Sequence, residues 1–346
     1  MPKPVSGSVR QLIDDTFLAY NAARVREACR VFVEKYARPE TTIGMSAAGA
    51  LLPAGMGASC LVPLMKAGLI DWMVVTGANL YHDLHFALNQ SLHRGQPGID
   101  DCALREEGVV RIYDILFDRN VLFDADAYVR DFCASLGPRG SIGSAEFHYL
   151  LGQRLIEEHP GTRDLSLLAT AADLGIPVFT SSPGDSTLGM NMAALALAGV
   201  PLDFDVMRDI NETAAIVHRT KKSGGMSGIF ILGGGSPKNF LLQTEPYIQE
   251  VLMIDDQGHD YFIQITDARA DTGGLSGATP SEAVSWGKLD PEKLPDTVVC
   301  YGDTTVYLPL IASYVLESGC RREQKRLYDS LEDMVGELRA DAKTAL

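Results

Sequence analysis

The segment SEAVSWGK at residues 281–288 places an acid, an indole and a primary amine close together: Glu282, Trp286 and Lys288. If the first part of the segment is helical, Glu282 and Trp286 share one face because they lie four residues apart. Gly287 then allows the chain to turn before Lys288. An ammonium group beside an indole in a dry cleft loses solvation, its pKa falls, and the neutral amine becomes a nucleophile toward an imine or a carbonyl. The competing interpretation of these residues is a surface lysine next to a core tryptophan.

The elements that must position this segment alternate between strands and helices. Short β-branched or apolar runs are each followed by a small or polar turn and then by a helix-like stretch. This alternation predicts an α/β fold, Rossmann-like, with a mostly parallel sheet and helices on both faces. The runs lie at 71–76 (DWMVVT), 176–181 (IPVFTS), 228–232 (GIFIL), 261–266 (YFIQIT) and 297–301 (TVVCY).

The chain contains no internal repeat, low-complexity segment or Pro/Ser-rich linker that would mark a domain boundary. We therefore expect one domain over residues 1–346, with a helical N-terminal extension at 1–40 and a C-terminal helix at 319–346. Further helices are predicted, for example, at 144–159, 205–221 and 307–318.

Residues 41–65 carry no charge and are long enough to cross a bilayer. Two prolines, four glycines and many small residues interrupt the stretch, and it lacks a run of Leu, Ile and Phe. A buried strand, a tight turn and a helix explain this composition better than a membrane span. We therefore expect no association with a membrane.

Charge and cysteine usage limit the classes of function. The net charge of −15 disfavours nucleic-acid binding, because phosphate contacts require clustered Lys and Arg. The six cysteines are scattered without a C-x-x-C pair, which is typical of reduced thiols. The first residues, MPKPVSGSVRQLIDD, lack the apolar core of a signal peptide. Together these features predict a cytoplasmic protein.

Small and polar residues follow each of the five predicted strands. The turns read TGAN from Thr76, SSPGD from Ser181, GGGS from Gly233, TDAR from Thr266 and GDTT from Gly302. Ligands of open α/β sheets bind beyond the carboxyl ends of the strands, and turns of this kind offer backbone N–H groups to phosphate and carboxylates to ribose. The agreement of five turns predicts a nucleotide or dinucleotide, although neither G-x-G-x-x-G nor a P-loop is present.

Five sequence blocks, in order, resemble the deoxyhypusine synthase family, which includes related homospermidine synthases. The segment SEAVSWGK is similar to the active-site lysine motif of that family. The other blocks are TGANLYHD at 76–83, SSPGDSTLG at 181–189, LGGGSPK at 232–238 and YGDTT at 301–305. The resemblance extends from about residue 41 to the C-terminus.

The resemblance implies a Rossmann-like α/β fold, the deoxyhypusine synthase fold, assembled as a homotetramer with NAD held at a subunit interface. It also implies a transferase in which a polyamine-type donor is oxidised with NAD, its aminoalkyl group passes to an enzyme lysine, and the group then moves to an acceptor amine and is reduced. In deoxyhypusine synthases the acceptor is a lysine of a translation initiation factor; in homospermidine synthases it is putrescine. The resemblance therefore implies a small-molecule amine as donor and either a second amine or a protein lysine as acceptor.

Residue roles follow from the same resemblance. Lys288 would carry the imine, Trp286 would form a wall of the substrate channel, and Glu282 would anchor a substrate amine. The stretch 49–53 would line the cofactor. NAD would be bound by Thr76, Gly77, Ala78, Asp185, Gly234, Asp267, Ala268, Asp303 and Thr304.

Several positions depart from the family pattern. Tyr81 and His82 stand where an acidic pair is expected, and Asn239 stands where a histidine is expected. Met190 and Leu275 each replace an acid. We therefore expect Tyr81 and Asn239 to contact an altered substrate, and His82 to carry a proton in place of a missing acid because its ordinary pKa lies near neutrality.

Other functions remain open from the sequence. His82, Asp83, His85 and His93 suggest a metal site, but no further His or Cys cluster supports one, and we expect no metal. A serine hydrolase is disfavoured because G-x-S-x-G is absent. The main alternative is an NAD-binding sensor or scaffold without turnover, favoured by the lost acids and opposed by the retained Glu282, Trp286 and Lys288.

Overall fold

The computed structural model describes residue 5 and residues 7–137, 139–200 and 202–343. Its centre is a six-stranded sheet in the order β11-β10-β9-β1-β2-β7, and every neighbouring pair is parallel. The α/β class and the mostly parallel sheet are therefore confirmed. The strands are β1 (Thr41–Ala47), β2 (Trp72–Val75), β7 (Val178–Phe179), β9 (Met226–Leu232), β10 (Tyr261–Thr266) and β11 (Thr297–Tyr301).

Along the chain, the side of the sheet to which new strands are added changes once, although all of the strands are parallel. From β1 the chain adds β2 and then β7 on one side, and it returns to place β9, β10 and β11 on the other side of β1. Loops after β1 and β9 therefore diverge, and such a switch point leaves a crevice at the carboxyl edge of the sheet. The sequence residues predicted to bind a nucleotide belong to the loops at this edge.

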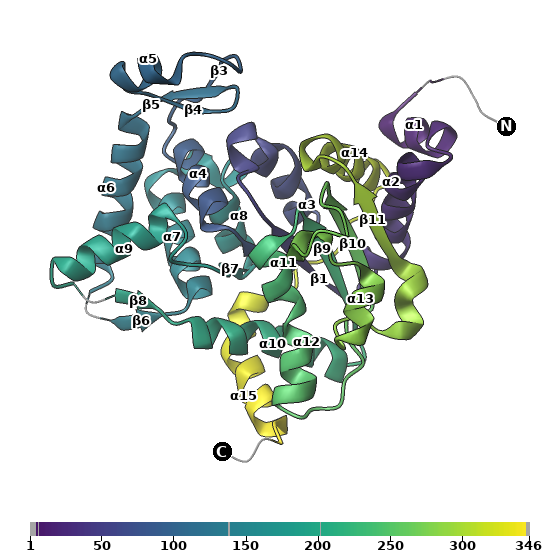
Figure 1. Ribbon diagram of the computed structural model, residues 1–346. Coiled ribbons are helices and arrows are strands. Elements are labelled where there is room, and N and C mark those ends of the chain that lie inside the picture. Colours follow the sequence, from purple (N-terminus) through teal and green to yellow (C-terminus); the bar gives the residue numbers. More distant parts are fainter. Residues whose placement is uncertain (1–4, 6, 138, 201, 344–346) are drawn as a thin grey trace.

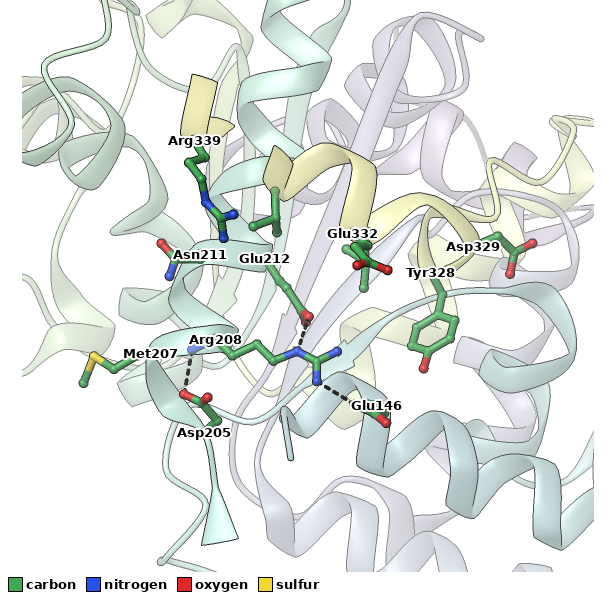
Figure 2. Close-up of a pocket in the computed structure, with 12 residues that line it drawn as sticks. Glu146, Asp205, Met207, Arg208, Asn211, Glu212, Tyr328, Asp329, Glu332 and Arg339 are labelled. Atoms are coloured by element: carbon green, nitrogen blue, oxygen red, sulfur yellow. Dashed lines mark hydrogen bonds and ion pairs between the residues drawn. The ribbon is translucent and has the colours of Figure 1, made fainter. Parts of the chain in front are cut away.

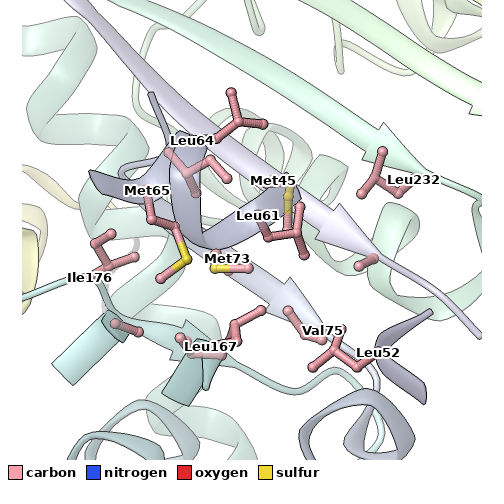
Figure 3. Packing of buried hydrophobic residues seen from close by; sticks show 14 of the residues in the cluster. Met45, Leu52, Leu61, Leu64, Met65, Met73, Val75, Leu167, Ile176 and Leu232 are labelled. Atoms are coloured by element: carbon pink, nitrogen blue, oxygen red, sulfur yellow. The ribbon is translucent and has the colours of Figure 1, made fainter. Parts of the chain in front are cut away.

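Helices cover both faces of the sheet, as the alternation of apolar side chains requires. Ile43 and Met45 of β1 pack in the larger core cluster, and Trp72 and Val74 of β2 pack in the second cluster on the opposite face. Figure 3 shows the first cluster, which includes Met45, Leu61, Met73 and Leu167. The first face is covered by α2 (Tyr20–Val31), α3 (Val62–Lys66), α8 (Leu167–Leu174) and α14 (Thr304–Glu317), and the second by α10 (Val206–Lys222), α11 (Gly235–Leu242) and α15 (Leu331–Asp341).

The uncharged stretch folds as a strand, a turn and a helix. Strand β1 is followed by a 3₁₀ turn at Leu52–Ala54, a π-helical turn at Gly57–Leu61 and then α3. Among the described residues, no helix has both the length and the apolar character needed to cross a bilayer. The prediction of a strand, a turn and a helix is therefore confirmed.

Between β2 and β9, beside the main sheet, the helix predicted at 144–159 is confirmed as α7, but sequence periodicity did not identify the short strands of this region. Figure 1 shows α6, α9 and a small sheet there, away from β10 and β11. The small sheet is antiparallel, β3-β5-β4, and β6 pairs separately with β8. The elements are α4 (Gly77–Ala87), β3 (His93–Arg94), α5 (Asp101–Glu106), β4 (Val109–Ile112), β5 (Ile115–Asp118), α6 (Asn120–Ser135), β6 (Gly140–Ile142), α7 (Ser144–Glu158), α9 (Thr187–Leu197) and β8 (Leu202–Phe204).

The ends of the chain differ in detail from the expectation. At the N-terminus α1 (Val9–Thr16) and α2 are helical, and a π-helical turn continues α2 to Tyr36. The C-terminal helix does not begin at residue 319: Gly319 has a φ of +75° and ends α14, and α15 begins only at Leu331. In the intervening segment the backbone bonds to a distant part of the chain instead of continuing a helix: the N–H of Arg322 donates to the Ala67 carbonyl at 2.9 Å.

Arg322 fixes this irregular segment through a buried ion pair. Its guanidinium donates to the Asp71 carboxylate at 2.7 Å and to the Gly68 carbonyl at 2.7 Å, and the two charged side chains are 3% and 1% exposed. Asp71 also accepts from the backbone N–H of Ile43 at 2.7 Å. The pair therefore joins the C-terminal segment to the starts of β1 and β2.

We predict that Arg322→Met lowers the free energy of unfolding by about 3–5 kcal/mol, because it leaves the Asp71 carboxylate buried without its counter-charge. Urea denaturation measures the loss. The neighbouring Arg321 is exposed, so Arg321→Met serves as the control and should change stability by less than about 0.5 kcal/mol. Equal midpoints for the two variants would contradict the assigned role of Arg322.

Candidate active site

The backbone around Lys288 is held on both sides. Helix α13 (Pro280–Ser285) begins with the Thr279 side chain as its N-cap and ends before Trp286. Gly287 has a φ of +65°, as expected for the turn that follows. The Lys288 N–H donates to the Ala283 carbonyl at 3.0 Å, and the Lys288 carbonyl accepts from the N–H of His259 at 3.1 Å.

The Lys288 side chain enters a cavity of about 290 Å³. Glu282 and Trp286 line the same cavity, so the structure brings together the three residues of the motif. Lys288 Nζ donates to Asn239 Oδ1 at 3.1 Å and lies 5.6 Å from the centre of the Trp286 ring system. Asn239 thus meets the lysine directly, from α11.

A second amine, Lys238, lines this cavity and was not predicted as a site residue. Its side chain is 2% exposed, and Nζ donates to Gln264 Oε1 at 3.0 Å and to the Ala278 carbonyl at 2.6 Å. The signal was present in the block LGGGSPK, where Lys238 follows Gly234 by one helical turn. Lys238 does not have the spacing of a P-loop lysine, so that motif gives it no role.

Burial shifts the pKa of both amines in the same direction. Loss of solvation lowers the pKa of Lys288, and the Glu282 carboxylate partly opposes this change. Burial, followed by repulsion from Lys288, lowers the pKa of Lys238 to about 8. Because each ammonium bonds to neutral oxygens instead of a carboxylate, a larger fraction of each amine is neutral near physiological pH than in an ordinary lysine.

The remaining wall of the cavity is largely apolar. Phe262 and Leu275 face it together with Leu242, Ala278 and Ala283. A neighbouring cavity of about 420 Å³ shares Asn239, Gln243 and Leu275 with it, so the two spaces adjoin at these residues. Leu275, which replaces an expected acid, therefore lies between the Lys288 cavity and this second cavity, which has both polar and apolar lining residues.

The predicted cofactor residues of the first turns are organised around Asn79. The Asn79 side chain is fully buried and accepts from the N–H groups of Leu51 and Leu52 at 2.6 and 3.1 Å. Thr76 caps α4 and donates its hydroxyl proton to the Gly49 carbonyl at 2.6 Å. These bonds join the stretch 49–53 to the start of α4, where Gly77 and Ala78 stand. Asn79 was not predicted as a site residue, although it lies inside the quoted TGAN turn.

Gly234 and Lys288 are connected through one short helix. Gly234 is the residue before α11, and a Cβ on it would collide with Ser276. The Ser276 hydroxyl accepts from the N–H of Gly235 at 2.9 Å. Lys238 and Asn239 follow one turn later and line the lysine cavity. The beginning of α11 therefore lies at the edge of the sheet, and its middle lines the Lys288 cavity.

The other predicted cofactor residues lie at the same edge. Asp185, Asp267 and Asp303 are all exposed beyond the ends of β7, β10 and β11. Asp303 caps α14 at Thr304 by accepting from the N–H of Thr305 at 2.6 Å through one carboxylate oxygen. The N–H of Ala268 donates to the Thr266 hydroxyl at 3.1 Å.

These residues fit a dinucleotide by the chemistry of their donor groups. The starts of α4, α11 and α14 meet the carboxyl edge of the sheet, and helix N-termini direct N–H groups and positive dipoles toward phosphate. Exposed carboxylates at the neighbouring strand ends provide acceptors for hydroxyl groups. The turns at 76–78 and 233–235 stand on the two sides of the switch point.

Tyr81 and His82 do not line the Lys288 cavity. The Tyr81 hydroxyl donates toward Asp126 Oδ1 at 2.8 Å and the Leu122 carbonyl at 3.0 Å, so it serves the packing of α4 on α6. His82 lies 3.4 Å from His85 between their Nδ1 atoms, and burial lowers its pKa. Within one chain the structure therefore offers no contact between these two residues and Lys288, and their substrate and proton-carrier roles stay predictions.

The histidines near His82 do not form a metal centre. No group of three or more His, Cys, Asp and Glu side chains suited to a metal ion occurs in the described part of the chain. Asp83 is instead a structural acceptor: its carboxylate accepts from Ser166 Oγ and from the N–H groups of Leu167 and Leu168 at 2.6–2.9 Å. It thereby caps α8.

The fold and the site together define a doubly wound α/β protein with helix N-termini and exposed carboxylates at the carboxyl edge of its sheet and a cavity that contains Lys238 and Lys288. Comparison with known proteins identifies the family. The sequence profile described as Deoxyhypusine synthase matches residues 12–315. A deoxyhypusine synthase-like protein of Nostoc punctiforme is 53% identical over 344 residues, which cover 98% of this chain and 88% of that protein. A "Probable deoxyhypusine synthase 2" of Methanosarcina mazei is 35% identical over 306 residues, covering 88% and 86%.

A solved structure agrees with the fold. The crystal structure of a candidate deoxyhypusine synthase from Entamoeba histolytica matches with a TM-score of 0.57 and 13% identity, covering 92% of this chain and 97% of that chain. The chain belongs to the deoxyhypusine synthase family. The resemblance inferred from the five sequence blocks is confirmed.

We predict that Glu282→Gln lowers the pKa of Lys288 further, because the variant removes the negative charge that stabilises the ammonium form. The measurement is the pH dependence of reductive alkylation at Lys288, followed by peptide mass spectrometry. The midpoint of the pH profile should move to lower pH.

Glu292→Gln removes the same charge from an exposed position outside the cavity and should leave the midpoint unchanged. A midpoint that moves upward in Glu282→Gln, or equally in both variants, would contradict the electrostatic role of Glu282.

Proposed function

We propose that this protein is an NAD-dependent transferase that moves an alkylamine group from a polyamine-type donor to an acceptor amine through an imine on Lys288. One observation carries the proposal: Lys288 Nζ lies in a cavity and donates a hydrogen bond to a neutral acceptor, the Asn239 side chain. Asn239 belongs to α11 and lies about one helical turn after the glycine turn at the switch point. A half-buried amine with a lowered pKa has the chemistry that imine formation requires.

The cofactor in this proposal is NAD, which supplies a hydride acceptor for the donor carbon and returns the hydride to the product. Thr76, Gly77 and Ala78 would hold it on one side of the switch point and Gly234 on the other. Asp185, Asp267, Ala268, Asp303 and Thr304 would complete the binding edge. Family resemblance and the donor groups at this edge support the assignment.

The group transfer is redox-neutral over the cycle. Oxidation of the donor amine would remove a hydride, which carries two electrons and one proton, together with a second proton, and would give an imine. Neutral Lys288 attacks the imine carbon, forms a new C–N bond, and the donor's other amine leaves with a proton. The acceptor amine then attacks the carbon bound to Lys288, which departs as a free amine. Return of the two electrons as hydride, with a proton, gives the secondary amine product.

Substrate recognition in this proposal differs from the usual family pattern. Glu282 is the one carboxylate among the described residues that line the Lys288 cavity, and Leu275 and Asn239 occupy positions where an acid and a histidine are expected. Each lost charge-assisted hydrogen bond forgoes about 1.5–3 kcal/mol. We therefore propose that Glu282 binds one ammonium group and that the rest of the donor packs on Trp286, Phe262 and Leu275.

Assembly as a homotetramer belongs to the same proposal. Trp286 is 58% exposed, Leu275 is exposed in a 3₁₀ turn that lines the cavity, and Met190 is exposed in the first turn of α9. Large apolar side chains of this kind at a site rim are typical of surfaces that another chain covers. A second copy would enclose the cavity and exclude water from Lys288.

A second function has support from the departures themselves. The loss of acids at Leu275 and Met190 favours an NAD-binding sensor or scaffold without turnover. A transferase that uses a protein lysine as acceptor is the third candidate, supported by names such as that of the Methanosarcina relative. Trapping of the covalent intermediate separates these possibilities.

We predict that incubation with NAD and a panel of di- and polyamines gives a transient NADH absorbance and, after borohydride reduction, an adduct on Lys288. Lys288→Ala should lose the adduct, whereas Lys293→Ala, a control on the following turn, should retain it. Tight NAD binding without NADH formation for any amine would favour the sensor. An adduct on Lys238 instead of Lys288 would contradict the assignment of the nucleophile.

We also predict that Leu275→Asp improves use of spermidine. The new carboxylate would face the cavity and pair with a second ammonium group, which is worth about 1.5–3 kcal/mol, or roughly a 10- to 150-fold gain in kcat/KM. Leu275→Asn is the matched control, because asparagine has nearly the same shape as aspartate but carries no charge. Equal gains in the two variants would show that size, and not charge, limits the substrate.

A further inference from the structure

The turn that carries Lys288 is held at Gly287 by a side chain from another part of the chain. Gln249 Nε2 donates to the Gly287 carbonyl at 2.8 Å. A Cβ on Gly287 would collide with Gln249 Oε1, so the amide group packs directly against the glycine. The turn therefore requires glycine twice, for its φ of +65° and for the close approach of Gln249.

The same amide group is also bonded to a buried carboxyl group. Gln249 Nε2 donates to Glu245 Oε2 at 3.0 Å, and Glu245 is 0% exposed. A side-chain amide has two N–H donors, and the two oxygens use both of them, which fixes the orientation of the group. Glu245 belongs to α12 (Thr244–Pro246), about one helical turn before Gln249. The Gln249 amide thus links a buried carboxyl group to the Gly287 carbonyl.

Gln249 takes its own position from a π-helical turn, Tyr247–Val251, which is joined to α10. The N–H of Leu252 donates to the Tyr247 carbonyl at 2.9 Å, five residues back, and closes the turn. The Tyr247 hydroxyl donates to Asn211 Oδ1 at 2.8 Å. Figure 2 shows Asn211 on α10, in the wall of a cavity of about 820 Å³. Because α10 packs on the main sheet, the turn is anchored to the body of the molecule.

Contacts from distant segments hold the turn on both sides of the Lys288 side chain. The N–H groups of Gly287 and Lys288 bond to carbonyls of α13, at 3.0 Å each, and so move with that helix. The Gln249 amide and the His259 N–H instead hold the Gly287 and Lys288 carbonyls from outside. Glycine has no side chain to restrict rotation, so without the Gln249 bond the peptide plane after Gly287 can rotate and carry Lys288 Nζ away from Asn239.

From these contacts we propose that Gln249 is a positioning residue, whose amide fixes the turn at Gly287 so that the Lys288 side chain enters its cavity. Glu245 assists by holding the amide in the orientation that reaches Gly287. The role of Gln249 in turnover rests on the proposed transferase function, whereas its effect on the placement of Lys288 does not.

The pH dependence of reductive alkylation at Lys288 tests this placement. Gln249→Met keeps the length of the side chain and removes both N–H donors. Because burial lowers the pKa of Lys288, release of Nζ into water should move the midpoint to higher pH, by about one unit. Gln153→Met is the matched control: Gln153 is also half-buried, does not line the cavity, and donates to the Ala172 carbonyl at 3.3 Å. It should leave the midpoint unchanged.

Variants of Glu245 test the same link even if Gln249→Met does not fold. Glu245→Gln keeps an acceptor oxygen for the Gln249 amide and should retain the wild-type midpoint. Glu245→Leu removes the acceptor and should raise the midpoint. The proposal is overturned if Gln249→Met has the wild-type midpoint, if Gln153→Met moves it equally, or if the two Glu245 variants move it by the same amount.

Borohydride trapping with NAD and an amine separates this proposal from the proposed function. If the wild type forms an adduct on Lys288, Gln249→Met should form it about tenfold more slowly or less, because a small misplacement of a reacting group costs at least this much. An unchanged rate would overturn the proposal. A wild type that forms no adduct contradicts the transferase function alone, and the alkylation midpoints then decide the role of Gln249.

Discussion

The parallel pairing of β1 with β9 is the constraint on which the rest of the site depends. Seven residues of each strand are in register, from Thr41 opposite Met226 to Ala47 opposite Leu232. The pairing puts the loop held by Asn79 beside the turn that starts α11. Because Gly234 stands at the start of α11 and Asn239 one turn later, the same pairing also fixes the acceptor of Lys288. A cofactor edge and a lysine cavity thus follow from one topological reversal.

Cationic side chains at the site bond to different kinds of partner from cationic side chains that are paired elsewhere in the molecule. Arg322 is paired with Asp71 at 2.7 Å, and Lys221 with Asp260 at 2.9 Å. Lys238 and Lys288 instead bond to amide and carbonyl oxygens. A carboxylate partner stabilises the charged form and raises the pKa of a lysine, whereas a neutral acceptor does not offset the cost of burial. The difference keeps both site amines closer to the neutral form that the proposed imine chemistry requires.

Much of the main sheet could be predicted from the sequence, because its strands are short apolar runs closed by polar turns. The runs at 261–266 and 297–301 have the bounds of β10 and β11. Between β3 and β8, the helix α7 and the strand β7 were predicted, but β4, β5 and β6 were not, because these strands are short and only partly buried and lack a clear apolar period. The C-terminal boundary was wrong since Arg322 replaces helical bonds by long-range ones, which no local pattern records.

The sequence predicted which site residues lie together when those residues are close in sequence. It did not predict contacts between residues that are far apart in sequence. Glu282, Trp286 and Lys288 meet as their spacing suggested. Lys238 was overlooked because its proximity to Lys288 depends on the packing of α11, and the separation of Tyr81 from Lys288 depends on a bond to Asp126 in α6. Each of these relations is set by tertiary contacts between distant segments.

The most direct measurement is a crystal structure of the protein with NAD and an unreactive amine. We expect the dinucleotide along the carboxyl edge of the sheet, between the turn at Thr76 and the turn at Gly234, with the nicotinamide ring directed toward Lys288 Nζ and the amine bonded to Glu282. A dinucleotide bound at another surface, with the Lys288 amine in solvent, would contradict the central claim.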